Sequence, residues 1–142
     1  MCINWIESNT LAEEKTFLWS YDGQKIVVLK EFKSGKEYKY VFSNSEINKI
    51  LSYIEKSGKV SLANSVSKLQ DGTEKEGIGK YIYDNINKDS GVAQTASQLV
   101  AIFYNANVLY YNNKKKGMEF WINNINWQER ILNFMHERKS IK

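Results

Sequence analysis

The stretch of chain that decides the fold is residues 108–122, Val-Leu-Tyr-Tyr-Asn-Asn-Lys-Lys-Lys-Gly-Met-Glu-Phe-Trp-Ile. Its two apolar runs, Val108–Tyr111 and Met118–Ile122, flank a polar turn that contains Gly117. Such runs on either side of a glycine-containing turn are typical of a β-hairpin. The turn also holds three consecutive lysines, so the sequence predicts a hairpin with a basic tip formed by Lys114, Lys115 and Lys116.

A helix is predicted directly before this hairpin, with Ser90 placed to cap it. Asn107 tolerates the left-handed conformation that ends a helix, so it marks the exit. The apolar positions follow helical spacing and are Val92, Ala96, Leu99, Val100 and Phe103. The opposite face is polar and offers Gln94, Thr95, Gln98 and Asn105.

Three further helices are predicted upstream. The first begins at a capping box, Ser43 to Glu46, and ends at Gly58. The second is short and is capped by Ser61, and the third begins at another capping box, Thr73 to Glu76. Their apolar stripes are Ile47, Ile50, Leu51 and Ile54; Leu62, Val66 and Leu69; and Ile78, Tyr81 and Ile82, followed by Asn85.

Four helices followed by a lysine-tipped hairpin resemble the winged helix-turn-helix family in the order and spacing of elements over residues 44–122. The resemblance implies that the helix from Val92 to Asn105 is a DNA-recognition helix and that the hairpin is its wing. The residues it assigns to DNA are Gln94, Thr95, Gln98, Asn105, Lys114, Lys115 and Lys116. Glutamine pairs with the adenine edge in the major groove, and lysines contact phosphates or the minor groove.

Other interpretations of these residues stay open. The polar helix face is also what an ordinary solvated helix presents, and lysines at a hairpin tip also prevent unwanted edge pairing. Winged helices also serve protein–protein contacts, because a fold does not fix a function.

The N-terminal part predicts a three-stranded antiparallel meander over Thr16–Tyr21, Gln24–Phe32 and Glu37–Phe42, with a hairpin turn at Asp22-Gly23. Its aromatic side chains are expected to pack on the first helix; these are Trp19, Tyr38, Tyr40 and Phe42. A sheet of this kind is also compatible with reading the DNA major groove. The other face, with Lys30 and Lys39, is compatible with a homodimer.

A metal-dependent nuclease is a further alternative. Asp22, Glu31 and Lys33 resemble the D…ExK site of the restriction-endonuclease-like nucleases, in which two carboxylates hold Mg²⁺ and lysine positions water. The short core argues against that family, and Asp22 has a simpler role in its turn. We expect no catalytic site, no cofactor and no metal, since His136 and Cys2 are the only residues of their types.

Composition limits the remaining classes. The 142 residues carry a net charge of +4, and no apolar run is long enough to cross a membrane. The single cysteine and the polar N-terminus favour the cytoplasm.

The sequence as a whole predicts an α+β fold with an N-terminal meander and helix (1–58), a winged-helix-like module (44–122) that shares this helix, and a C-terminal helix (123–142). The C-terminal helix is expected to begin at Asn126. The expected function is non-enzymatic DNA binding, as in a small transcriptional or mobile-element regulator. The alternatives are a protein-interaction or inhibitor module and the small nuclease.

Overall fold

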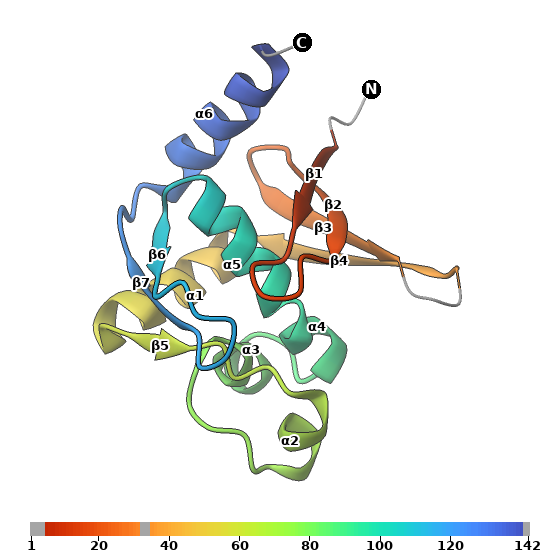
Figure 1. Cartoon of the computed structure of the whole chain (residues 1–142), viewed down its shortest axis with the longest axis vertical. Helices are drawn as coiled ribbons and strands as arrows, with labels where there is room; N and C mark the ends of the chain where they lie inside the picture. Colours follow the sequence, from red (N-terminus) through yellow and green to blue (C-terminus); the bar gives the residue numbers. More distant parts are fainter. Residues whose placement is uncertain (1–4, 32–34, 141–142) are drawn as a thin grey trace.

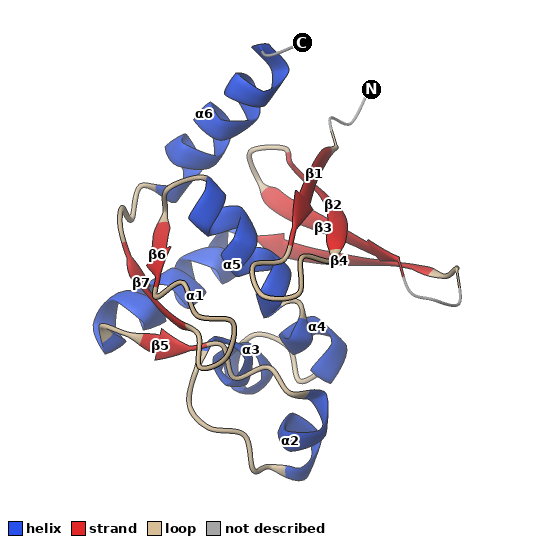
Figure 2. Ribbon diagram, in the orientation of Figure 1, coloured by secondary structure: helices blue, strands red, loops and turns tan. Residues whose placement is uncertain are grey.

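The protein is an α+β chain with two antiparallel sheets and helices between and around them (Figures 1 and 2). The computed structural model describes residues 5–31 and 35–140, without the side chains of Glu31, Lys139 and Ser140. Its elements, in chain order, are β1 (Ile6–Asn9), β2 (Thr16–Tyr21), β3 (Lys25–Glu31), β4 (Glu37–Ser43), α1 (Asn44–Ser57), β5 (Val60–Ser61), α2 (Val66–Asp71), α3 (Ile78–Asn85), α4 (Ser90–Gln94), α5 (Ala96–Asn105), β6 (Leu109–Tyr111), β7 (Glu119–Ile122) and α6 (Trp127–Ser140). No helix among these is long and apolar enough to cross a membrane.

The N-terminal sheet is a meander in the order β1-β2-β3-β4, one strand more than the sequence predicts. The three predicted strands are confirmed, and the extra strand β1 pairs with β2 from Ile6↔Trp19 to Asn9↔Thr16. Its alternate residues point inward, and Ser8 Oγ accepts a hydrogen bond of 3.0 Å from the buried Trp19 indole. A polar strand of only four residues has too little apolar patterning to be recognised from its own sequence.

The second sheet has the order β5-β7-β6 and contains the predicted hairpin. Strands β6 and β7 pair antiparallel in the register Leu109↔Ile122, which confirms that prediction. Ser61 does not cap a helix, because it lies in β5, where Val60 pairs with the buried Phe120. A pairing between segments so far apart along the chain leaves no local signal in the residues around Ser61.

Besides the cap at Ser61, which does not form, the helix start is predicted correctly at α1 and wrongly at α3 and α4. At α1, Ser43 and Glu46 form both hydrogen bonds of the capping box, and Gly58 ends the helix. The second capping box is wrong, since α3 begins at Ile78 and Glu74 instead accepts a hydrogen bond from the backbone N–H of Ser65. The fourth helix is capped by Asp89 rather than by Ser90.

Helix α5 lies in the middle of the molecule, between the two sheets (Figure 1). It contacts β1 of the first sheet, β6 of the second, and helices α3, α4 and α6. Its buried residues therefore occur all around the helix rather than on one stripe, and they include Ala96, Leu99, Val100, Ala101, Ile102 and Phe103. A helix that is apolar all around is a core helix.

Helix α6 closes the core of the first sheet from the C-terminal end of the chain. Phe134 stacks on Trp19 with ring centroids 6.1 Å apart, and the Trp127 indole donates a 2.7 Å hydrogen bond to Asn48 of α1. Trp127 and Ile131 of this helix are buried in the core. Side chains from both sheets and from α6 thus belong to one continuous core.

Two glycines allow α3 to approach the segment that follows β5. A Cβ atom at Gly79 would lie 2.4 Å from the carbonyl oxygen of Ala63, and one at Gly77 would lie 2.5 Å from that of Ser61. The backbone N–H of Gly79 also donates a 2.8 Å hydrogen bond to the carbonyl of Leu62. Glycine is therefore required in this helix, despite its poor helix propensity.

We predict that Gly79→Ala lowers the free energy of unfolding by about 1–3 kcal/mol, because the added methyl group must displace backbone. At a helix position where the added methyl group meets no other atoms, Gly→Ala would raise the free energy of unfolding by up to about 1 kcal/mol. Urea denaturation measures the difference, with Asn85→Ala at the exposed end of α3 as the control, which we expect to change stability by less than about 1 kcal/mol. A urea midpoint of Gly79→Ala equal to that of the wild type would contradict the close approach of α3 to the segment after β5.

Candidate nucleic-acid interface

The hairpin β6–β7 with its connecting loop, residues 109–122, forms the wing. The loop has a defined conformation: the Asn112 side chain donates to the carbonyl of Gly117 at 3.0 Å and accepts from the backbone N–H of Lys114 at 3.3 Å. Asn113 and Gly117 both adopt positive φ. The three lysines between them are exposed, and none forms an ion pair with another residue in the ranges 5–31 and 35–140. The wing thus presents three charges on a short, hydrogen-bonded support.

The prediction of a single helix from Val92 to Asn105 is wrong. The segment from Val92 to Asn105 is divided into α4 and α5 at Thr95, whose hydroxyl donates to the carbonyl of Gly91 at 3.0 Å. Thr95 is fully buried and Gln98 is only 9% exposed, so neither lies on a solvated face. A helix enclosed by two sheets cannot enter the major groove, which is read by an exposed helix or β-ribbon.

The structure brings some of the predicted residues together and separates others. Gln94, Gln98 and Lys115 line one cavity of about 760 Å³, which Lys30 also lines and which we name the Lys30 cavity. Lys114 and Lys116 stay on the exposed tip of the wing. Asn105 lies at the far end of α5, where it lines a separate hollow with Arg138.

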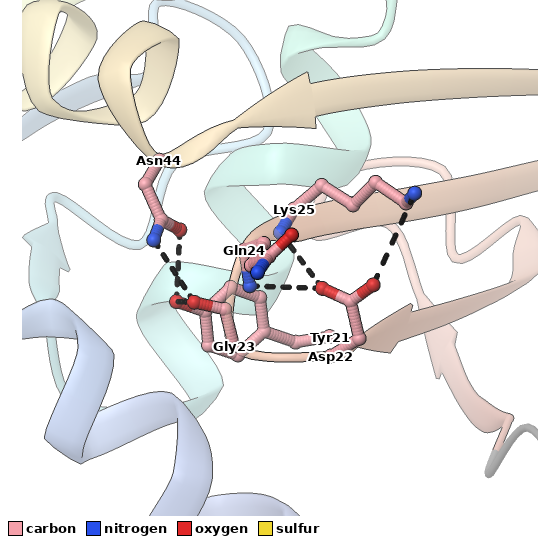
Figure 3. A network of polar contacts seen from close by, with 6 residues as sticks. All are labelled: Tyr21, Asp22, Gly23, Gln24, Lys25 and Asn44. Atoms are coloured by element: carbon pink, nitrogen blue, oxygen red, sulfur yellow. Dashed lines mark hydrogen bonds and ion pairs between the residues drawn. The ribbon is translucent and has the colours of Figure 1, made fainter.

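The nuclease triad does not assemble. Asp22 caps the β2–β3 turn, accepting hydrogen bonds from the backbone N–H groups of Gln24 at 2.8 Å and Lys25 at 3.0 Å (Figure 3). These two hydrogen bonds hold the pKa of Asp22 below its usual value. Glu31 is the last residue of β3, about 20 Å from the turn at the rise of an extended strand, and Lys33 lies outside the described residues.

Figure 3 also shows what this turn does. The Tyr21 hydroxyl donates a 2.8 Å hydrogen bond to Asn44, and Asn44 donates a 2.9 Å hydrogen bond to the carbonyl of Gly23. The turn is thereby tied to the first residue of α1. Asp22 and its neighbours stabilise the junction of the meander with the helices, which is a structural role.

Lys30 lies on the opposite face of the sheet from the one that the sequence predicts. We expected it on the outer face of the sheet with Lys39, but it follows the buried Ile26 and Val28 at alternate positions of β3 and lies on the inner face. Lys39 pairs with Leu29, so it lies on the opposite face. The strand alternation of Ile26, Val28 and Lys30 was the signal that identifies the inward side chain.

Lys30 is buried beside an aromatic ring. The residue is 9% exposed, and its ammonium lies 4.7 Å from the centre of the Tyr40 ring. Burial lowers the pKa of Lys30 from its ordinary value of 10.5 to about 8, and the positive charge of Lys15 acts in the same direction. Desolvation therefore opposes the charge of Lys30, whereas the contact with the Tyr40 ring favours it.

The chain matches no protein-family model, no curated protein and no solved structure. The candidate interface therefore rests on the geometry of the wing and of the Lys30 cavity.

We predict that Lys30→Met raises the free energy of unfolding at pH 7 by about 1–3 kcal/mol. The pKa of Lys30 is lower in the folded chain than in the unfolded chain, so the unfolded chain binds more protons between about pH 8 and pH 10.5. The free energy of unfolding of the wild type should consequently rise through that window. The difference in free energy of unfolding between Lys30→Met and the wild type should therefore shrink. Urea denaturation at pH 7 and pH 9.5 measures both effects.

Lys39→Met, on the exposed face of the same sheet, is the matched control and should show no such pH-dependent difference. A Lys30→Met variant that is less stable than the wild type by the same amount at both pH values would contradict the burial argument.

Proposed function

We propose that this protein binds duplex DNA without catalysing a reaction, and that it does so through phosphate contacts from the wing. The observation that carries the proposal is the presentation of Lys114, Lys115 and Lys116 on a hydrogen-bonded loop. All three side chains are exposed. Lysine ammonium groups that meet phosphates release condensed counterions, which supplies most of the free energy of non-specific DNA binding.

The shape of the wing supports contact with a duplex. Its strands are short, and β5 pairs with β7, so that the hairpin is anchored to the body of the molecule (Figure 2). Lys59 directly precedes β5 of the same sheet, and its ammonium lies 5.1 Å from the centre of the Trp121 ring. Four lysines of this region thus belong to one small sheet and its loops.

Base reading by α5 is not part of this proposal, because Thr95 and Gln98 are buried. Phosphate contacts position a protein on DNA but carry no sequence information. The binding that we propose is accordingly weakly dependent on sequence and strongly dependent on salt.

A protein partner is the second candidate. Tyr110 is 48% exposed on β6, and its ring centroid lies 6.1 Å from that of Trp121 on the neighbouring strand. An exposed Tyr–Trp pair beside a lysine is the kind of surface that protein interfaces use, since these aromatic residues are enriched there. Binding of a protein through this pair leaves the three tip lysines without a role.

We predict that replacing Lys114, Lys115 and Lys116 together with alanine flattens the dependence of log affinity on log salt concentration. Each lost phosphate contact removes about 0.9 from the slope, so three contacts remove up to about 2.7. Titration of wild type and variant with duplex DNA at several salt concentrations gives both slopes. Stability should change little, because exposed lysines contribute little to folding.

The charge-matched control replaces Lys36, Lys39 and Lys49, which are all exposed. Lys36 directly precedes β4, Lys39 lies on β4, and Lys49 lies on α1. If the wing makes the contacts, this control should keep the wild-type slope. Equal slopes for the wild type and the wing variant would refute DNA binding by the wing and leave the aromatic pair as the candidate surface.

A further inference from the structure

The Lys30 cavity lies where three parts of the chain meet. The loop between β1 and β2, the segment between β5 and α2, and α5 form its walls, and Lys115 of the wing also lines it. Its volume of about 760 Å³ is within the range of small-molecule sites, about 300–1,000 Å³. Two of its polar lining residues, Lys30 and Gln98, are each only 9% exposed.

Gln98 has an amide oxygen without a partner. The side chain lines the cavity at 9% exposure, and its Oε1 is buried and accepts no hydrogen bond from the described part of the chain. Asn64, which also lines the cavity, donates its side-chain amide to Ser97 Oγ at 2.7 Å and to the carbonyl of Gln94 at 3.0 Å. An unsatisfied buried oxygen of this kind is rare in native proteins, and a bound donor would satisfy it.

The charges around the cavity favour an anion. Lys15, Lys30 and Lys115 line it, and Glu13 is the one acidic residue among the described residues that do so. Glu13 forms an ion pair with Lys15, with the nitrogen and oxygen 2.9 Å apart. Three positive charges and one negative charge leave a net charge of +2, which matches the roughly double negative charge of a phosphate monoester near neutral pH.

We propose that the Lys30 cavity binds a small phosphorylated molecule of the nucleoside monophosphate class. Its phosphate lies against Lys30 and the other lysines, and an N–H or O–H group of the base or sugar donates to Gln98 Oε1. A nucleotide combines these two groups in one molecule that fits the volume. Lys115 belongs both to this cavity and to the wing tip, but Lys30 and Gln98 lie outside the proposed DNA contacts, so this inference does not depend on the proposed function.

The probes are AMP, GMP, CMP and UMP, each with its unphosphorylated nucleoside, and inorganic phosphate. Calorimetric titration of the full chain should show binding of at least one nucleotide, at least about 10-fold tighter than its nucleoside, as expected for charge-assisted hydrogen bonds to phosphate. The protein should also unfold at a higher temperature when the nucleotide is bound. Binding of none of the four, or equally tight binding of inorganic phosphate, would overturn the proposal.

Two variants test the residues. Lys30→Met and Gln98→Leu should each weaken nucleotide binding by about 10-fold or more, while unfolding at the same temperature as the wild type or a higher one. Lys39→Met removes the same charge from the opposite face of the sheet and should bind nucleotide like the wild type. Wild-type affinity in Lys30→Met would refute the assignment, and loss of nucleotide binding in Lys39→Met would do so too.

Duplex DNA is the last ligand to be tested, because it carries phosphate groups like those of the nucleotide. A duplex cannot reach a lysine that is 9% exposed, so Lys30→Met should bind duplex DNA like the wild type. An equal loss for nucleotide and duplex would make the cavity part of the DNA surface and overturn the separate site. Failure of the wing to bind DNA, by contrast, leaves the nucleotide titrations unaffected.

Discussion

The enclosure of α5 between two sheets is the constraint on which the rest of the structure depends. The helix contacts β1 on one side and β6 on the other, so both sheets share its apolar side chains as a common core. The sheets cannot be separated without exposing Leu99, Ile102 and Phe103 to water. The same enclosure removes the helix from any role in reading DNA, and it turns Gln98 from a surface residue into a wall of a cavity.

Local patterns in the sequence predicted the parts of the fold that local forces determine. The Ser43–Glu46 capping box, the Asp22-Gly23 turn and the two runs of the wing all form as expected, because each depends on neighbouring residues. The errors occur where distant segments decide. Ser61 joins a strand because Phe120 lies beside it, and α3 starts late because its glycines must approach residues 61–64.

The candidate site was predictable to a lesser extent. The exposed lysines of the wing follow from three charges in a turn, and the structure places them as expected. The burial of Thr95 and Gln98 on the helix before the wing was not predictable, since it results from the covering by β1 and the other elements around α5. Gln94 and Asn105 of the same predicted face are exposed. Strand alternation along β3 alone predicts that the Lys30 side chain points inward. A lysine that follows apolar positions is nevertheless ordinarily assigned to the solvent-facing side. Where a charged side chain breaks an apolar pattern, the pattern is the better guide to its direction.

The contacts made by α6 bear on the order in which the chain assembles. Gln128 hydrogen-bonds to Tyr21 across 107 positions of sequence, and Trp127 to Asn48 across 79. Loop closure over such separations slows folding, since entropy is lost before the contacts form. During synthesis the meander emerges first, but the inner side of Trp19 is not covered by Phe134 until nearly the whole chain has left the ribosome. The aromatic side of the meander therefore stays uncovered until the segment around Phe134 has been made, and apolar surface that a partly folded chain exposes promotes aggregation.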